Sequence, residues 1–374
     1  MLQQQSLDNL IEISRHPVFG PALKNLTICI DHLTDYPEFN HALFYWGDHA
    51  RCLEEGDVDY AHLGGNLRET DEEPIVDRQA YDLQLENQKF MMEFGLNTTY
   101  LAQAMARLPN LETVAVDDAF KPWGATALMR QTGLALTNAI EAFDSVEFVE
   151  HVLRALVLAI VASNTSLYEL NIVPGHLSGD GISPDMLVFP GPLLRHIRSH
   201  PLSLTSLSLS VRPRNRTRPD SEFVTDLLGF IDLFPRLQRL SLEFDPLDQH
   251  KHFPEFSQRL RLQNLRFLGL TAVQCTDGEL ATLLVGHKNT LEEVCFDVVD
   301  IIAEGGSWQA LLATMRDELS VQVLTMDNCR WGGKEVYYRE SENDDATYLD
   351  SFETGQTMED WTDTINNLVI GDGK

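Results

Sequence analysis

The amino-acid sequence predicts an α/β protein, a solenoid in which parallel strands line one wall and helices line the other. Three observations support this fold class. One six-residue apolar pattern returns eight times, amphipathic stretches separate the later copies, and the spacing matches one strand–loop–helix unit. A unit of this kind cannot bury its apolar face alone, so neighbouring units are expected to stack around a continuous core.

The repeated strand pattern is apolar-x-x-apolar-x-apolar, where x is any residue. Its eight copies occupy residues 23–28, 111–116, 167–172, 204–209, 237–242, 265–270, 291–296 and 321–326. Several copies follow a short loop with Pro or Asn, as at 108–110 and 234–236. A single hexamer would be weak evidence, but eight copies with shared flanks are hard to obtain by chance. The apolar positions are expected to face the core, and the x positions beside the fourth and sixth residues to face outward.

The spacing of the later copies predicts the architecture. From residue 167 the copies start at 167, 204, 237, 265, 291 and 321, in steps of about 26 to about 37 residues. These steps lie around the upper end of leucine-rich-repeat periods. We therefore expect a leucine-rich-repeat-like solenoid over residues 1–330, with strands on the concave face and helices on the convex face.

The two ends of the chain are expected to depart from this regular array. Repeats are irregular to about residue 165 and regular from about 166, because longer steps indicate insertions in the N-terminal half. One of these insertions is acidic and spans about 48–82. Residues 331–374 are expected to form a cap, in which Trp331, Tyr337 and Tyr338 seal the last repeat, and an acidic tail.

Amphipathic stretches between the strands predict helices. Residues 221–231, 276–284 and 307–315 each open with a Ser or Thr that can cap a helix, and their apolar residues are spaced by three and four. Longer helices are expected at about 87–108 and 145–163. The apolar run 155–162 within the latter has about half the length that crosses a bilayer, so we expect it to be buried.

Composition limits the class of partner and the compartment. A formal net charge of −29 disfavours nucleic acid and anionic membranes, and it favours a basic protein partner or simply solubility. The five cysteines include no C-x-x-C pair, so we expect reduced thiols, with Cys29 and Cys295 as small buried hydrophobes. The N-terminus shows no signal-peptide pattern, which predicts an intracellular protein, cytoplasmic or nuclear.

The sequence contains no P-loop, dinucleotide-binding glycine motif, H-E-x-x-H or G-x-S-x-G. His250 and His252 offer two imidazoles without a third ligand at zinc-site spacing. The turn-rich residues 175–185 lack the acidic spacing and terminal glutamate of a calcium loop. We therefore expect a non-enzymatic protein with no metal and no cofactor. The alternatives are an enzyme with a loop-built site and a degenerate structural paralogue.

Outward-facing strand positions supply the candidate partner-binding residues. The residue after the hexamer is acidic in four copies: Asp117, Glu243, Asp297 and Asp327. Ser210 and Thr271 take the same position in two more copies. If the strands stack in register, these side chains form a column on the concave rim, which would attract a segment bearing Lys or Arg. Asn171 and Arg239 are further candidates on this face. The alternative is that exposed strand ends are simply polar.

One basic cluster follows the fourth strand, in a loop of alternating Pro, Asn, Thr and Arg residues. Its cations are Arg212, Arg214, Arg216 and Arg218. The alternation keeps the loop extended, which suits a solvated loop, a nuclear signal, a contact for an acidic partner or a clamp on the chain's own acidic loops.

Residues 6–20, followed by the first hexamer at 23–28, resemble the stretch just after the F-box in filamentous-fungal F-box proteins. The later Leu-x-x-Leu-x-Leu strands resemble the divergent leucine-rich region of the same proteins, so the resemblance covers most of the chain. It implies substrate recognition by the repeat region. In that family the F-box docks a Skp-type adaptor of a ubiquitin ligase. This sequence begins where the F-box would have ended, so we expect the recognition half without adaptor docking.

Overall fold

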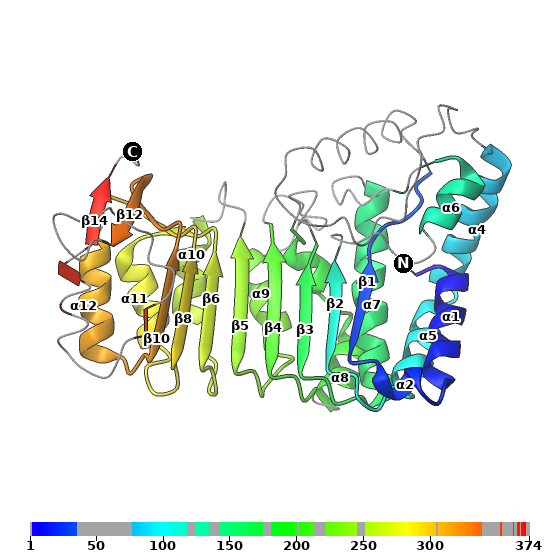
Figure 1. Ribbon diagram of the computed structural model, residues 1–374, viewed down its shortest axis with the longest axis horizontal. Helices are drawn as coiled ribbons and strands as arrows, with labels where there is room; N and C mark the ends of the chain where they lie inside the picture. Colours follow the sequence, from blue (N-terminus) through cyan, green and yellow to red (C-terminus); the bar gives the residue numbers. More distant parts are fainter. Residues whose placement is uncertain are drawn as a thin grey trace.

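The computed structural model describes residues 2–35, 77–117, 125–134, 136, 143–174, 181–199, 202–212, 222–244, 251–303, 306–338, 352–353, 362, 365–366 and 368–371. In these residues the protein is a mixed α/β structure built on one long sheet. Figure 1 shows the strands side by side in chain order, with helices such as α7, α9 and α10 behind them.

Eight parallel strands make up the long sheet. They are β1 Asn25–Cys29, β2 Thr113–Asp117, β3 Glu169–Val173, β4 Ser206–Val211, β5 Arg239–Phe244, β6 Phe267–Thr271, β8 Glu293–Asp297 and β10 Val323–Asp327. The short β13 (Phe352–Glu353) pairs antiparallel with the first half of β10. Each parallel strand begins at the third residue of a predicted hexamer, so the strand prediction is confirmed for all eight copies.

A repeated backbone contact sets the common register. The carbonyl of Lys24, just before β1, accepts hydrogen bonds from the N–H groups of Glu112 and Thr113 at 2.8 and 3.0 Å. The carbonyls of residues 112, 168, 205, 238, 266 and 292 each accept two successive N–H groups of the next unit in the same way. Every strand therefore enters the sheet at the same height as its neighbour, whatever the length of chain between them.

The helices confirm most of the predicted periodicity. Within the described residues they are α1 Gln4–Arg15, α2 Phe19–Ala22, α4 Arg78–Glu93, α5 Leu96–Met105, α6 Ala125–Thr132, α7 Phe143–Ser163, α8 Gly191–Ser199, α9 Phe223–Ile231, α10 Phe253–Arg259, α11 Asp277–Val285 and α12 Trp308–Glu318, with the 3-10 helix η2 Pro184–Leu187. α7, α9, α11 and α12 match predicted stretches. Thr276 caps α11 through a reciprocal contact with Glu279, and Ser307 caps α12.

One predicted helix is wrong. The stretch 87–108 is not continuous, because α4 ends at Glu93 and α5 begins at Leu96. Between them Gly95 takes φ +61°, a left-handed conformation that glycine adopts without steric cost and that ends the first helix. α4 also begins at Arg78, inside the predicted acidic insertion; residues 48–76 of that insertion lie outside the described residues.

The core lies between the sheet and the helices. Hexamer residues alternate between faces, so Leu170, Ile172, Leu240 and Leu242 are at most 1% exposed. Burying one such leucine contributes roughly 1.5–3 kcal/mol relative to leaving it in water. Consecutive helices α10, α11 and α12 also contact one another. The apolar run predicted to be buried lies in α7 and is buried on its core face, including Leu156 and Val157.

The last repeats carry a second, smaller sheet of five strands. β7 Gln274–Cys275, β9 Asp300–Ile301 and β11 Arg330–Trp331 are parallel, and β12 Lys334–Tyr338 and β14 Leu368–Gly371 join antiparallel. Trp331 donates from its indole N–H to Gly306 O at 2.8 Å. The predicted boundary of a separate cap at 331 stays a prediction.

The described cysteines differ in burial, and none of them is in a disulfide. Cys29, Cys275 and Cys329 are buried, and burial raises the pKa of Cys29 to about 12. The prediction that Cys295 is buried is wrong: it is partly exposed, because it occupies an outward x position of its hexamer. Cys52 lies outside the described residues. No helix that the structure describes is long and apolar enough to cross a bilayer.

Candidate functional site

The face of the long sheet that points away from the helices carries the candidate site, and we call it the open face. Strand register divides its side chains into three rows. The entry row runs from β1 to β10 as Asn25, Thr113, Glu169, Ser206, Arg239, Phe267, Glu293 and Val323. The middle row is Thr27, Ala115, Asn171, Ser208, Ser241, Gly269, Cys295 and Thr325. The exit row over β4 to β10 is Ser210, Glu243, Thr271, Asp297 and Asp327.

The exit row has the geometry expected of the predicted acidic column. Its five residues are direct Cα partners on adjacent strands, which are spaced about 4.8 Å apart in a sheet. Asp117 pairs instead with Cys29 and Val173 on β1 and β3, so it is separated from the other three carboxylates. The acidic part of the row is therefore Glu243, Asp297 and Asp327. Their role in binding stays a prediction.

Burial and a neighbouring negative charge together alter the pKa of one carboxyl group in the exit row. The pKa of Asp297 is raised, first by burial and then by the charge of Asp327 on the neighbouring strand. A hydrogen bond with Asn328 opposes this shift. Two like charges on adjacent strands repel, so a positively charged group placed over them would be stabilised.

Arg239 is the centre of a cluster of contacting side chains in the entry row. Its Nη1 donates to Glu293 Oε2 at 3.0 Å, and its guanidinium lies over the Phe267 ring, 3.9 Å from the centroid. The three residues come from β5, β6 and β8, so Arg239 reaches across the strand between it and its partner. We call Arg239, Phe267 and Glu293 the arginine platform.

Gly269 has no side chain, and this provides the space that the Phe267 ring of the arginine platform occupies. A Cβ at this position would come within 3.2 Å of Phe267 Cε1 and 3.1 Å of Ser241 Oγ. The Phe267 ring therefore lies along its own strand, above the glycine. Sequence reasoning identified Arg239 but missed Phe267, Glu293 and Gly269. Aligning the third residue of three consecutive hexamers, Arg-Phe-Glu, is the signal that would have found the first two.

Asn171 lies in the middle row on β3, between Ala115 and Ser208. Its Oδ1 atom is buried and has no hydrogen-bond partner within the described residues. Beside it, Thr113 Oγ1 donates to Glu169 Oε2 at 3.1 Å in the entry row. The structure thus places Asn171 and Arg239 on the same open face, in different rows and two strands apart.

Only the first residue of the predicted basic loop can be described. Arg212 follows β4, and its backbone N–H donates to Ile182 O at 2.8 Å. Arg212 therefore lies beside the exit-row end of β4. Arg214, Arg216 and Arg218 lie outside the described residues.

The three histidines with shifted pKa values lie outside the eight parallel strands. Burial lowers the pKa of His32 to about 4, and it lowers those of His151 and His287. His287 is held by Leu262 N–H and Leu283 O, which is a structural role. Within the described residues no three His, Cys, Asp or Glu side chains are grouped to hold a metal ion, and His250 lies outside them.

A cavity of about 260 Å³ lies at the N-terminal end of the molecule rather than on the sheet. Its lining comes from α1, α4 and α6 and is dominated by carboxamides, among them Gln4, Gln84 and Gln131. Asp8 is its one ionisable lining residue. This lining holds no nucleophile paired with a base, so it does not form a recognisable catalytic arrangement.

No family model and no curated protein matches this chain. Among solved structures, the chain is similar to the crystal structure of the leucine-rich repeat-containing protein LegL7 from Legionella pneumophila. The two share 12% identity with a TM-score of 0.34, over 73% of this chain and 78% of that chain. This similarity is loose, and no residue of the open face is interpreted from it. The resemblance to fungal F-box proteins stays a prediction.

Proposed function

We propose that this protein is a non-enzymatic, leucine-rich-repeat-like solenoid that binds a protein segment bearing Lys or Arg on its open face. The observation that carries the proposal is the register of the exit row, which brings Glu243, Asp297 and Asp327 onto one edge of the sheet. The raised pKa of Asp297 supports it, because that shift combines burial with repulsion from Asp327. A cationic side chain above this pair would relieve the repulsion.

Ion pairs between the exit row and a basic partner are expected to contribute modest binding energy. Their main effect is on the rate of association. An exposed ion pair contributes about 0.2–1 kcal/mol, so three carboxylates cannot supply high affinity alone. Their combined field accelerates encounter with a basic partner and makes the rate depend on salt. The arginine platform adds a pre-ordered contact of the kind enriched at interface centres, since its guanidinium is already held by Phe267 and Glu293.

The finer proposal is substrate recognition of the F-box/leucine-rich-repeat type, in an intracellular setting. Its support is the resemblance of residues 6–28 to the stretch that follows the F-box, together with the free thiols among the described cysteines. Co-purification of the full chain with a Skp-type adaptor would favour this role. Recovery of a basic partner without the adaptor would restrict the role to recognition alone.

A displayed library of random extended peptides would test the proposal. We expect the wild-type chain to enrich peptides rich in Lys and Arg, with association rates that fall as salt rises. The triple variant Glu243→Gln, Asp297→Asn, Asp327→Asn should lose this enrichment. A matched control, Glu112→Gln with Glu292→Gln, removes two carboxylates that form ion pairs just before the entry row and should keep it. Equal enrichment by all three proteins would contradict the proposal.

A further inference from the structure

Helix α4 displays an apolar stripe at the end of the molecule. Figure 1 shows α4 and α6 beyond β1, at the terminal edge of the sheet. Leu83, Phe90 and Phe94 are 56%, 51% and 60% exposed, and the two rings are in contact with centroids 4.6 Å apart. Their spacing by seven and four residues places all three on one line along the helix. The outer face of a terminal unit is expected to be polar, so this stripe needs another explanation.

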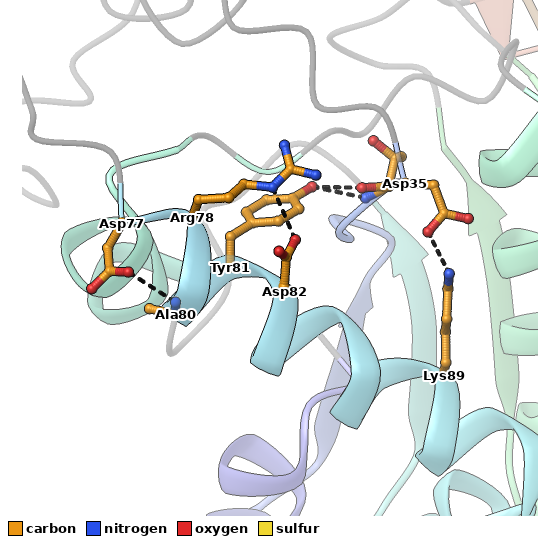
Figure 2. A network of polar contacts seen from close by, with 8 residues as sticks. Asp35, Asp77, Arg78, Ala80, Tyr81, Asp82 and Lys89 are labelled. Carbon is orange, nitrogen blue, oxygen red and sulfur yellow. Dashed lines mark hydrogen bonds and ion pairs between the residues drawn. The ribbon is translucent and has the colours of Figure 1, made fainter.

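The inner face of α4 is firmly attached, so the stripe is held on a rigid support. Tyr81 OH donates to Thr34 O at 2.8 Å and accepts from Thr34 N–H at 3.1 Å. Gln88 exchanges two hydrogen bonds with the backbone of Leu33, at 2.9 and 3.0 Å. Figure 2 shows the Tyr81 contact beside the Lys89–Asp35 ion pair, all on the side of α4 that faces the segment after β1.

The cations of α4 are used within the protein, whereas two of its carboxylates are not. Arg78 pairs with Asp82 at 3.0 Å, and Lys89 pairs with Asp35 (Figure 2). No ion pair to Glu86 or Glu93 occurs among the described residues, and both are exposed. At 100° per residue these two glutamates lie side by side on one flank of the stripe. The surface is therefore apolar along its centre and negative along one border.

We infer that the stripe on α4 docks an amphipathic helix of a partner protein, with an apolar face of Leu or Phe and Lys or Arg along one flank. The stripe runs over twelve residues from Leu83 to Phe94, the residue that caps α4, and is about 16 Å long, which suits a helix lying alongside. The basic flank would meet Glu86 and Glu93. A second copy of this chain fits less well, because it brings the same acidic flank and a net charge of −29.

Two synthetic helical peptides of about five turns would test this inference. Both carry the same Leu and Phe face; one has Lys along the flank and the other has Glu. By fluorescence anisotropy the wild-type chain should bind the Lys peptide roughly tenfold more tightly than the Glu peptide. Phe90→Ser with Phe94→Ser should weaken the Lys peptide roughly tenfold or more. Glu86→Lys with Glu93→Lys should reverse the preference.

Matched controls separate this surface from the open face and from folding. Tyr168→Ser removes another exposed aromatic residue, which is 54% exposed at the entry of β3, and should leave binding unchanged. The exit-row triple variant should also bind the Lys peptide normally. Failure of the α4 inference and failure of the proposed function can therefore be told apart. Leu83→Ser provides a second test if the double Phe variant melts early.

Three outcomes would overturn the inference. The first is Lys-peptide binding that both the Phe and the Leu83 variants retain. The second is concentration-dependent dimerisation of the wild type that the Phe variant loses, which would assign the stripe to a second copy of this chain. The third is binding to neutral lipid vesicles that depends on the same residues, which would assign it to a membrane surface.

Discussion

The two ends of the long sheet use the same strand unit with very different connections. β6 and β8 begin at residues 267 and 293, whereas β1 and β2 begin at residues 25 and 113. The entry contact is nevertheless the same, since one carbonyl accepts two N–H groups of the next strand at both ends. Strand pairing therefore depends on the hexamer and not on the length of chain between copies. That tolerance allows insertions at the N-terminal end without loss of register.

The exits of the strands differ more than the entries. β6, β8 and β10 are each followed by a left-handed residue, at Ala272, Val298 and Asn328, with φ of 48–56°. These turns return the chain to the short strands β7, β9 and β11. The C-terminal repeats consequently keep a regular edge on which acidic residues align, whereas the N-terminal end presents the exposed face of α4. One end of the molecule offers charge in register and the other offers an apolar stripe.

The largest expected effect comes from the shared core. Leu268→Ala in β6 removes a side chain that is fully buried, so the free energy of unfolding should fall by about 2–5 kcal/mol in urea denaturation. The equivalent Leu26→Ala in β1 should cost less, because Leu26 is only partly buried. Equal losses would show that the two ends share one equally packed core.

Acid should destabilise the folded protein by protonating His32, which is buried at the N-terminal end. The pKa of His32 is lowered to about 4 by burial, so the unfolded chain binds a proton that the folded chain excludes. Stability is complete above the ordinary histidine pKa of about 6.5, and it falls as the pH drops towards 4, by on the order of 3 kcal/mol.

The control for this prediction is His32→Gln, followed by urea denaturation between pH 7 and pH 4. The variant should be less stable at pH 7, because the ring stacks on Phe148 and contacts Ser145. Its stability should depend less steeply on pH than that of the wild type. An unchanged slope would place the acid sensitivity in other groups, such as His287 in the C-terminal repeats.

Backbone strain should make a glycine substitution after β8 affect stability differently from one at the end of β3. Val298 is β-branched and has φ +53°, a conformation that glycine adopts without penalty. Val298→Gly should therefore raise the free energy of unfolding by about 1 kcal/mol, which a higher midpoint of thermal unfolding would report. Val173→Gly, at the exit of β3 where φ is not positive, should lower it. Destabilisation by both changes would mean that packing of Val298 outweighs its strain.

The smallest effect concerns the arginine platform. A double-mutant cycle of Arg239→Ala and Glu293→Ala should give a coupling energy of about 0.5–1 kcal/mol, because Phe267 fixes the guanidinium. The Lys24–Glu112 pair at the other end is more exposed, at 61% and 56%, and should couple more weakly. Gly269→Ala should reduce the Arg239–Glu293 coupling by lifting the ring. An unaltered coupling would show that the ring does not position Arg239.

Sequence reasoning succeeded where the signal was periodic and local. The hexamers located all eight parallel strands, and the Thr276 and Ser307 caps located two helix starts within a residue. It failed where one residue overrode a pattern, as at Gly95, whose left-handed conformation divides a continuous helical periodicity. It also treated Cys295 as a core residue from its apolar neighbours, although its place in the hexamer is an outward one.

What the sequence by itself determined is therefore the strand unit, its repetition and the acidic residue that follows it. Those features depend on contacts between residues close together in the chain, which periodicity records. Only the tertiary structure decided which outward side chains meet. Arg239 reaches Glu293 across an intervening strand, over a ring that a glycine accommodates. It also decided which face of α4 stays exposed, because that depends on Leu33, Thr34 and Asp35 occupying the other face. The Arg239–Glu293 ion pair and the contacts of α4 with Leu33, Thr34 and Asp35 join residues more than forty positions apart, and no local pattern records them.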